Sequence, residues 1–120
     1  MDIYSPCALG ATINDNTINQ LKCSVIAGAA NNQLMDEKLH GQILFQKGIV
    51  YAPDYLINAG GVMNCYAEVH DISSEKVMEM AEDIYNTTTQ ILNLSKEQNI
   101  PTFLAANRIA EERLRKESQA

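Results

Sequence analysis

Short runs of β-branched and apolar residues alternate with helix-length segments through the first half of this 120-residue chain. Three of the runs predict strands, at Asp2–Pro6, Ser24–Ala27 and Ile49–Ala52. The segments between them predict helices over Ala8–Leu21 and Lys38–Lys47, because apolar residues recur in both at helical spacing. Short apolar strands that alternate with helices are typical of a parallel sheet with helices packed on it. We therefore predict an α/β fold with about three parallel strands.

The second half of the chain predicts helices alone. One helix is expected to begin at Pro53 and Asp54 and to continue to Tyr66, because its apolar residues recur at helical spacing. Gly60 and Gly61 lie in the interior of this predicted helix, where each costs about 1 kcal/mol relative to alanine. Close packing or a close ligand would explain that cost.

Two further helices are predicted, over Ser74–Asn99 and from Pro101 onward. Ser73 or Ser74 is a suitable N-cap for the first of them. Its apolar stripe indicates a core or interface face. In the last helix, five residues are expected to face inward: Phe103, Ala106, Ile109, Ala110 and Leu114.

The length and charge of the chain limit its organisation and its partners. At 120 residues it is one domain at most, which we divide into βα repeats over 1–55 and terminal helices over 56–120. A net charge of −6 argues against a nucleic-acid partner, because phosphates select clustered Lys and Arg. No apolar run reaches the roughly 18 residues of a membrane helix, and the N-terminus lacks the segments of a signal peptide. We therefore expect a cytoplasmic protein without a membrane segment.

The cysteines and histidines form no metal or nucleophile motif. Cys7, Cys23 and Cys65 are odd in number and widely spaced, so we interpret them as reduced thiols rather than a disulfide framework or a metal site. His40 and His70 have no partner at ligand spacing. We expect both histidines at the surface or at helix ends.

Two segments rich in Gly, Ala and Asn follow the second and third predicted strands, at Ala27–Asn32 and Asn58–Asn64. Glycine allows another group to approach the backbone closely, and Asn offers donors and an acceptor without charge. These residues also dominate ordinary turns, but two such segments at corresponding positions favour a ligand site. Ligands bind at the carboxyl ends of strands in an open parallel sheet. We therefore expect an uncharged, amide-bearing ring such as nicotinamide to bind here.

Longer stretches of the chain resemble one enzyme family. They are Asp2–Ala11, Val25–Leu34, Gly48–Tyr55, Ile57–Val62 and Ile100–Arg113. These stretches are similar to the leucine dehydrogenases, within the wider family of glutamate, leucine, phenylalanine and valine dehydrogenases. The resemblance implies the C-terminal half of a Rossmann-type NAD-binding domain, followed by an all-helical part. It also implies the family's reaction, the oxidative deamination of an L-amino acid with NAD to a 2-oxo acid and ammonia.

The resemblance implies site residues as well. Five positions would lie along the nicotinamide side of the cofactor: Cys7, Ala8, Ala30, Asn31 and Asn58. Val62 and Cys65 would line the pocket for the side chain of L-leucine or a similar branched-chain amino acid. Cys65 departs from the aliphatic residue expected there, although its thiol is small and apolar enough to serve.

No catalytic residue is assigned within the chain. The family's substrate domain, with its catalytic lysine and aspartate, matches no part of the sequence, and the phosphate-binding Gly-x-Gly-x-x-Gly motif is not found in it. We therefore expect Met1 to be the start of a truncated reading frame and the fragment alone to be inactive.

Two alternatives stay open from the sequence. A relative specific for phenylalanine or valine would differ only in its pocket residues. A non-enzymatic half-domain would instead bind a partner chain or drive oligomer assembly. In either case we expect a homo-oligomer, because the predicted edge strand beginning at Asp2 lacks a neighbour and the terminal helices carry long apolar stripes.

Overall fold

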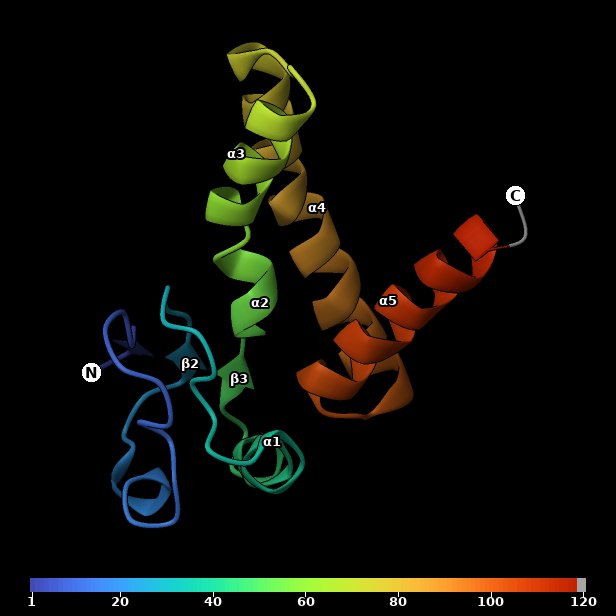
Figure 1. Ribbon diagram of the computed structural model, residues 1–120. Helices are drawn as coiled ribbons and strands as arrows, with labels where there is room; N and C mark the ends of the chain where they lie inside the picture. The colour runs from blue at the N-terminus through green and yellow to red at the C-terminus, as the bar shows by residue number, and fades with distance from the viewer. Residues whose placement is uncertain (119–120) are drawn as a thin grey trace.

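The computed structural model describes residues 1–118 and contains a small sheet, followed by helices that extend away from it (Figure 1). The elements of the first half are β1 (Ile3–Tyr4), a 3-10 turn (Ile18–Gln20), β2 (Val25–Ile26), α1 (Glu37–Gln46) and β3 (Val50–Tyr51). Those of the second half are α2 (Asp54–Ile57), α3 (Gly60–Val69), α4 (Ser74–Gln98) and α5 (Thr102–Ser118).

The sheet is parallel, in the order β1-β2-β3. Ile3 pairs with Val25 and Tyr4 with Ile26, and the same two residues of β2 pair with β3. The predicted α/β class and the three parallel strands are confirmed. Each strand is shorter than predicted, since only two residues of each are paired in the sheet. Backbone hydrogen bonds such as that from Ala52 N–H to Ile26 O join the same segments beyond these pairs.

The predicted helix over Ala8–Leu21 is wrong. The segment is irregular except for the 3-10 turn Ile18–Gln20. The Asn14 Oδ1 atom accepts the N–H groups of Asn16 (3.0 Å) and Thr17 (3.2 Å), and the Thr17 hydroxyl donates back to the chain. Side chains that bind nearby backbone in this way offer it an alternative to helical hydrogen bonds.

The apolar residues of this irregular segment are nevertheless in the core. Ile13 and Ile18 are buried together with Ile26, Leu44 and Tyr51 from the strands and α1. Ile13 also forms a parallel bridge with Leu34. The periodicity therefore identified buried residues correctly, although the conformation that buries them is not a helix.

The single helix predicted from Pro53 to Tyr66 is two helices. α2 ends at Ile57 and α3 begins at Gly60, so the two glycines start a helix instead of lying inside one. A Cβ atom built on Gly60 or Gly61 would have no atom within 4 Å among residues 1–118. Close packing within this part of the chain therefore does not explain the glycine pair.

The helices α4 and α5 follow the predicted boundaries closely. The Ser73 hydroxyl caps α4 by accepting the Lys76 N–H, as one of the two predicted N-caps. α4 lies beside α2 and α3 and contacts α5 (Figure 1). It ends at Gln98, and the C-cap residue Asn99 has a φ of 52°, the left-handed conformation common after a helix.

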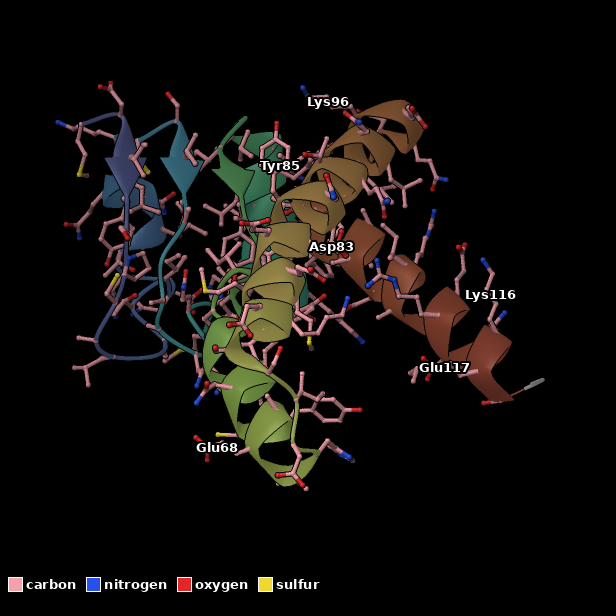
Figure 2. All side chains as sticks on the ribbon, turned by 90° about the horizontal axis from the view of Figure 1, so that it is seen from above. Glu68, Asp83, Tyr85, Lys96, Lys116 and Glu117 are labelled. Atoms are coloured by element: carbon pink, nitrogen blue, oxygen red, sulfur yellow. The ribbon has the colours of Figure 1, made fainter. Side chains whose placement is uncertain are left out.

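The inward face predicted for α5 is correct only in its first half. Phe103 and Ala106 are buried, and Ile109 is half-buried. Ala110 is exposed and Leu114 is 63% exposed, so the prediction is wrong for these two residues. The physical reason is visible in Figure 2, where the end of α5 that carries Lys116 and Glu117 extends beyond the other elements.

His40 contradicts the expectation of a surface or helix-end histidine. It lies inside α1 and is 1% exposed. Its Nδ1 atom accepts the N–H of Asp36 (2.9 Å), and its Nε2 atom lies 3.1 Å from an Asp15 carboxylate oxygen. These two partners satisfy both ring nitrogens, which is the usual condition for burying a polar group. His70, in contrast, is exposed at the C-terminal end of α3, as predicted.

Within residues 1–118, no helix has both the length and the apolar character that crossing a membrane requires. The same residues hold no group of three or more His, Cys, Asp or Glu side chains placed to bind a metal ion. Cys7 and Cys65 are exposed thiols and Cys23 is a buried one.

The glycines give a test of the packing. A Cβ atom on the buried Gly41 would lie 2.5 Å from the ring of Phe103, whereas one on Gly61 would meet open space. We predict that Gly41→Ala lowers the free energy of unfolding by about 1–3 kcal/mol through overpacking. The control Gly61→Ala should instead raise it, by up to about 1 kcal/mol, through helix propensity. Urea unfolding of the 120-residue chain measures both values, and a change of the same sign in the two variants would contradict the described packing.

Candidate functional site

The chain leaving β1 and the chain leaving β2 are tied together at the carboxyl end of the sheet. The Ala30 N–H donates to Pro6 O at 3.0 Å. Gly28 lies so close to Pro6 that a Cβ atom there would be 2.1 Å from the Pro6 carbonyl oxygen. Only glycine permits this approach. The Gly28 to Asn32 loop is therefore fixed against the end of β1.

The same loop is tied to the chain leaving β3. The Gln33 N–H donates to the Asp54 carboxylate at 2.8 Å, across 21 residues of sequence. The Gln33 side chain is fully buried, and its Nε2 group donates to the carbonyl oxygens of Gly28 (2.7 Å) and Ala30 (2.9 Å). The loop is thus held from the inside by one side chain and from the side by a carboxylate.

Asn31 and Asn58 come together across these ties. The Asn58 Nδ2 group donates to the Ala29 carbonyl oxygen at 3.2 Å and to Asn31 Oδ1. These bonds leave Asn58 Oδ1 and Asn31 Nδ2 without a protein partner among residues 1–118. The pair therefore presents one free acceptor and one free amide donor, with no formal charge, at the end of the strands.

Cys7 lies beside the same loop. Its thiol is exposed and lies 3.3 Å from the Ser5 hydroxyl. The Ala29 backbone N–H, first, and the Ser5 hydroxyl, second, lower the pKa of Cys7, because both hydrogen bonds favour the thiolate. Ala8 follows as an exposed residue, and Ala30 is buried beneath the loop.

A hollow of about 390 Å³ adjoins the asparagine pair, and it is lined by Asn31, Asn32, Leu34, Glu37, Tyr51, Asp54 and Tyr55. Burial first, and the carboxylates of Glu37 and Asp54 second, raise the pKa of Tyr55 to about 12. Burial likewise raises the pKa of Tyr51. Both phenols are therefore neutral near pH 7 and serve as hydrogen-bonding groups rather than as bases.

The structure thus brings together the five residues predicted for the cofactor, but it places the two predicted for the substrate elsewhere. Val62 is 72% exposed on α3, and Cys65 is exposed on the same helix. α3 continues from α2 away from the sheet (Figure 1). Nothing among residues 1–118 covers either side chain, so their role stays a prediction.

Gln33 and Asp54 were missed as site residues. Asp54 was interpreted only as part of the start of a helix, and it is the first residue of α2. Gln33 lies directly after the Asn31-Asn32 pair and before the buried Leu34. An uncharged polar residue between a Gly/Asn loop and an apolar position was the available signal.

The chain was compared with known proteins. The model of the glutamate/leucine/phenylalanine/valine dehydrogenase family matches residues 1–120. Leucine dehydrogenase from Bacillus cereus is 54% identical over 113 residues, which are 94% of this chain and 31% of that enzyme. L-tryptophan dehydrogenase from Nostoc punctiforme is 50% identical over 114 residues, or 95% of this chain and 32% of that enzyme.

Solved structures agree with these matches. The crystal structure of L-tryptophan dehydrogenase from Nostoc punctiforme superposes with a TM-score of 0.94 at 48% identity, and covers 99% of this chain and 35% of its own. Glutamate dehydrogenase from Peptoniphilus asaccharolyticus superposes with a TM-score of 0.68 at 25% identity, and covers 85% of this chain and 27% of its own. The chain therefore spans about a third of the length of the relatives that it matches.

The resemblance inferred from the sequence is confirmed over nearly the whole chain, and the fold around the strand ends is that of a solved relative. This chain belongs to the glutamate/leucine/phenylalanine/valine dehydrogenase family.

Proposed function

We propose that this chain forms the nicotinamide side of the NAD-binding domain of a leucine-type amino-acid dehydrogenase. The observation that carries the proposal is the Asn31–Asn58 pair at the carboxyl ends of parallel strands. Ligands of open parallel sheets bind at that edge. In this proposal residues 1–55 are the second half of a Rossmann-type domain, and the helices of 56–120 follow it.

The unpaired atoms of the asparagines fit a carboxamide. A nicotinamide carboxamide has an N–H₂ donor and a carbonyl acceptor, and the pair offers Asn58 Oδ1 as acceptor and Asn31 Nδ2 as donor. Asn58 is held in this orientation because its Nδ2 group already donates to Ala29 O. Cys7 and Ala8 would border the ring, with Ala30 beneath the loop.

The complete enzyme would oxidise L-leucine or a similar branched-chain amino acid to a 2-oxo acid and ammonia in the cytoplasm. NAD, when bound, supplies the hydride acceptor. The residues of this chain would orient the nicotinamide ring and leave the chemistry of proton transfer to groups outside residues 1–120. Val62 and Cys65 would contact the substrate side chain from α3.

Several leucine dehydrogenases support the leucine-type assignment over its rivals. Those from Bacillus subtilis and Thermoactinomyces intermedius are 55% and 54% identical to this chain. The tryptophan and phenylalanine enzymes are 50% and 45% identical. Because Val62 and Cys65 alone represent the pocket, the difference favours leucine through overall similarity rather than through pocket shape.

The chain alone should have no dehydrogenase activity. It lacks the Gly-x-Gly-x-x-Gly motif, and hence the site at a helix N-terminus that binds the cofactor's phosphates. We expect the purified 120-residue chain to form no NADH from L-leucine, L-valine or L-phenylalanine. Formation of NADH above a no-enzyme control would overturn this part of the proposal.

The asparagines can be tested in a chimera of the Bacillus cereus leucine dehydrogenase in which this chain replaces the matching 113 residues. We predict that Asn31→Ala and Asn58→Ala each lower kcat/KM for NAD by about tenfold, as expected for the loss of a hydrogen bond to a bound polar group. Thermal stability should change little, because Asn31 is exposed and Asn58, the C-cap of α2, is only half-buried. The control is Asn93→Ala, which alters an exposed residue of α4.

A chimera that turns over L-leucine and is insensitive to both asparagine substitutions would contradict the proposed site. Equal losses in the Asn93→Ala control would indicate a general effect on the fold.

We also propose that the chain self-associates, as in the alternative of an interaction module. Among residues 1–118, β1 pairs with β2 alone, so its second edge is unpaired there, and Ile3 on this strand is 59% exposed. Unpaired edges recruit further strands, and a lysine in the edge strand opposes this. We expect a dimer or larger species in sedimentation at micromolar concentration, and a shift toward monomer in Ile3→Lys. A stable monomer of 13.3 kDa would contradict this expectation.

A further inference from the structure

We propose that Gln33 and Asp54 are positioning residues, which set the placement of Asn31 against Asn58 and thereby the seat of the nicotinamide carboxamide. The inference rests on the proposed function for its ligand. The dependence of the Asn31–Asn58 contact on Gln33 and Asp54 can be measured separately, without any ligand.

Gln33 fixes the loop that carries Asn31. Its Nε2 group faces two carbonyl oxygens, those of Gly28 and Ala30, which lie on either side of Ala29. This arrangement curls the loop around the buried side chain, which is fully inaccessible. Because the Nε2 group must face two carbonyls, the Oε1 atom is turned the other way, and it is buried without a partner among residues 1–118.

The unpartnered oxygen is informative about the role of Gln33. Leaving a buried acceptor unpaired costs on the order of 1–3 kcal/mol. An apolar residue of similar volume would fill the same space without that unpaired oxygen, but it would leave the carbonyl oxygens of Gly28 and Ala30 without the Nε2 donor. The two donated hydrogen bonds to the loop are what glutamine supplies and an apolar residue does not.

Asp54 fixes Asn58 relative to the same loop. Its carboxylate accepts the Gln33 N–H at 2.8 Å, and it lies in the first turn of α2, where a negative charge is favourable. The Asn58 N–H donates to the Asp54 carbonyl oxygen at 3.0 Å, so the two residues are one helical turn apart on the same face. Because the Asp54 carboxylate is hydrogen-bonded to the loop, Asn58, one helical turn later, is placed against Ala29 and Asn31.

The first experiment uses the 120-residue chain without cofactor. The side-chain amide signals of Asn31 and Asn58 are recorded by ¹⁵N NMR in the wild-type chain and in Gln33→Met and Asp54→Ala. We expect the Asn58 signals to be shifted from free-amide positions in the wild type and to return toward them in both variants. The controls Gln90→Met and Asp83→Ala change exposed residues of α4 and should leave the signals in place.

The second experiment uses the chimeric enzyme and separates positioning from stability. We expect Gln33→Met and Asp54→Ala to raise KM for NAD by about tenfold, with KM for L-leucine changed less than threefold, since each removes one or two hydrogen bonds that hold the site. Asp54→Asn, which keeps an acceptor, should recover most of the loss. In the Asn58→Ala background, Asp54→Ala should have less than a threefold further effect, because residues that act through one another are not additive.

The outcomes distinguish the two proposals. If the asparagine variants are impaired while Gln33→Met and Asp54→Ala keep wild-type NMR signals and KM for NAD, the positioning role is overturned and the proposed function stands. If the NMR shifts follow Gln33 and Asp54 but the asparagine variants keep full activity, the coupling stands and the nicotinamide assignment fails. Independent, multiplying losses for Asp54→Ala and Asn58→Ala would also overturn the positioning role.

Discussion

The parallel register of three very short strands is the constraint on which the rest of the structure depends. Each strand contributes two residues to the ladder, and backbone hydrogen bonds such as that from Ala52 N–H to Ile26 O extend the pairing beyond them. Burial of Ile26 and Tyr51 and the bridge between Ile13 and Leu34 beside the sheet support the same register. Because the strands are parallel, the segments that follow them all leave the sheet at the same end, where the carboxyl ends of the strands lie. Every residue of the candidate site comes after one of the strands and therefore lies toward this end of the sheet.

At that end of the sheet, hydrogen bonds join segments that are far apart in the sequence. Pro6 receives the Ala30 N–H, and Asp54 receives the Gln33 N–H. An enzyme that holds a ligand between loops needs such ties, since loops without them are mobile. The glycine at position 28 belongs to the same arrangement, because it allows two backbones to lie against each other. The site is therefore a surface whose segments are joined by hydrogen bonds, and Asn31 and Asn58 lie on it.

The sequence predicted the parts of the fold that depend on local pattern. β-branched apolar runs identified the strands, and caps identified the limits of α4. The irregular segment over Ala8–Leu21 was not predictable from periodicity, because Asn14 and Thr17 bind the backbone locally and compete with a helix. The burial of His40 was missed for a related reason, since its partner Asp15 lies 25 residues away.

The candidate site was predictable to the same extent. Glycines and asparagines after strands indicated where a ligand would bind, and Asn31 and Asn58 are indeed in contact. The Gln33–Asp54 tie could not be found in this way, because it joins residues 21 apart through a backbone N–H that every residue possesses. Val62 and Cys65 were assigned by resemblance alone. Both side chains are exposed on α3, and nothing among residues 1–118 covers them.

The chemical reactivity of Cys7 depends on this arrangement. A thiolate is the form that reacts with maleimides and disulfide reagents, so a thiol with a lowered pKa is labelled faster than an ordinary one. Of these two groups, the Ala29 N–H belongs to the loop after β2, so its effect on the pKa of Cys7 requires the loop to lie against the end of β1, whereas Ser5 is on the same segment as Cys7. Because Cys65 is exposed as well, the alkylation rate of Cys7 in a Cys65→Ser variant reports the closeness of the two backbone segments, while the buried Cys23 stays protected until the chain unfolds.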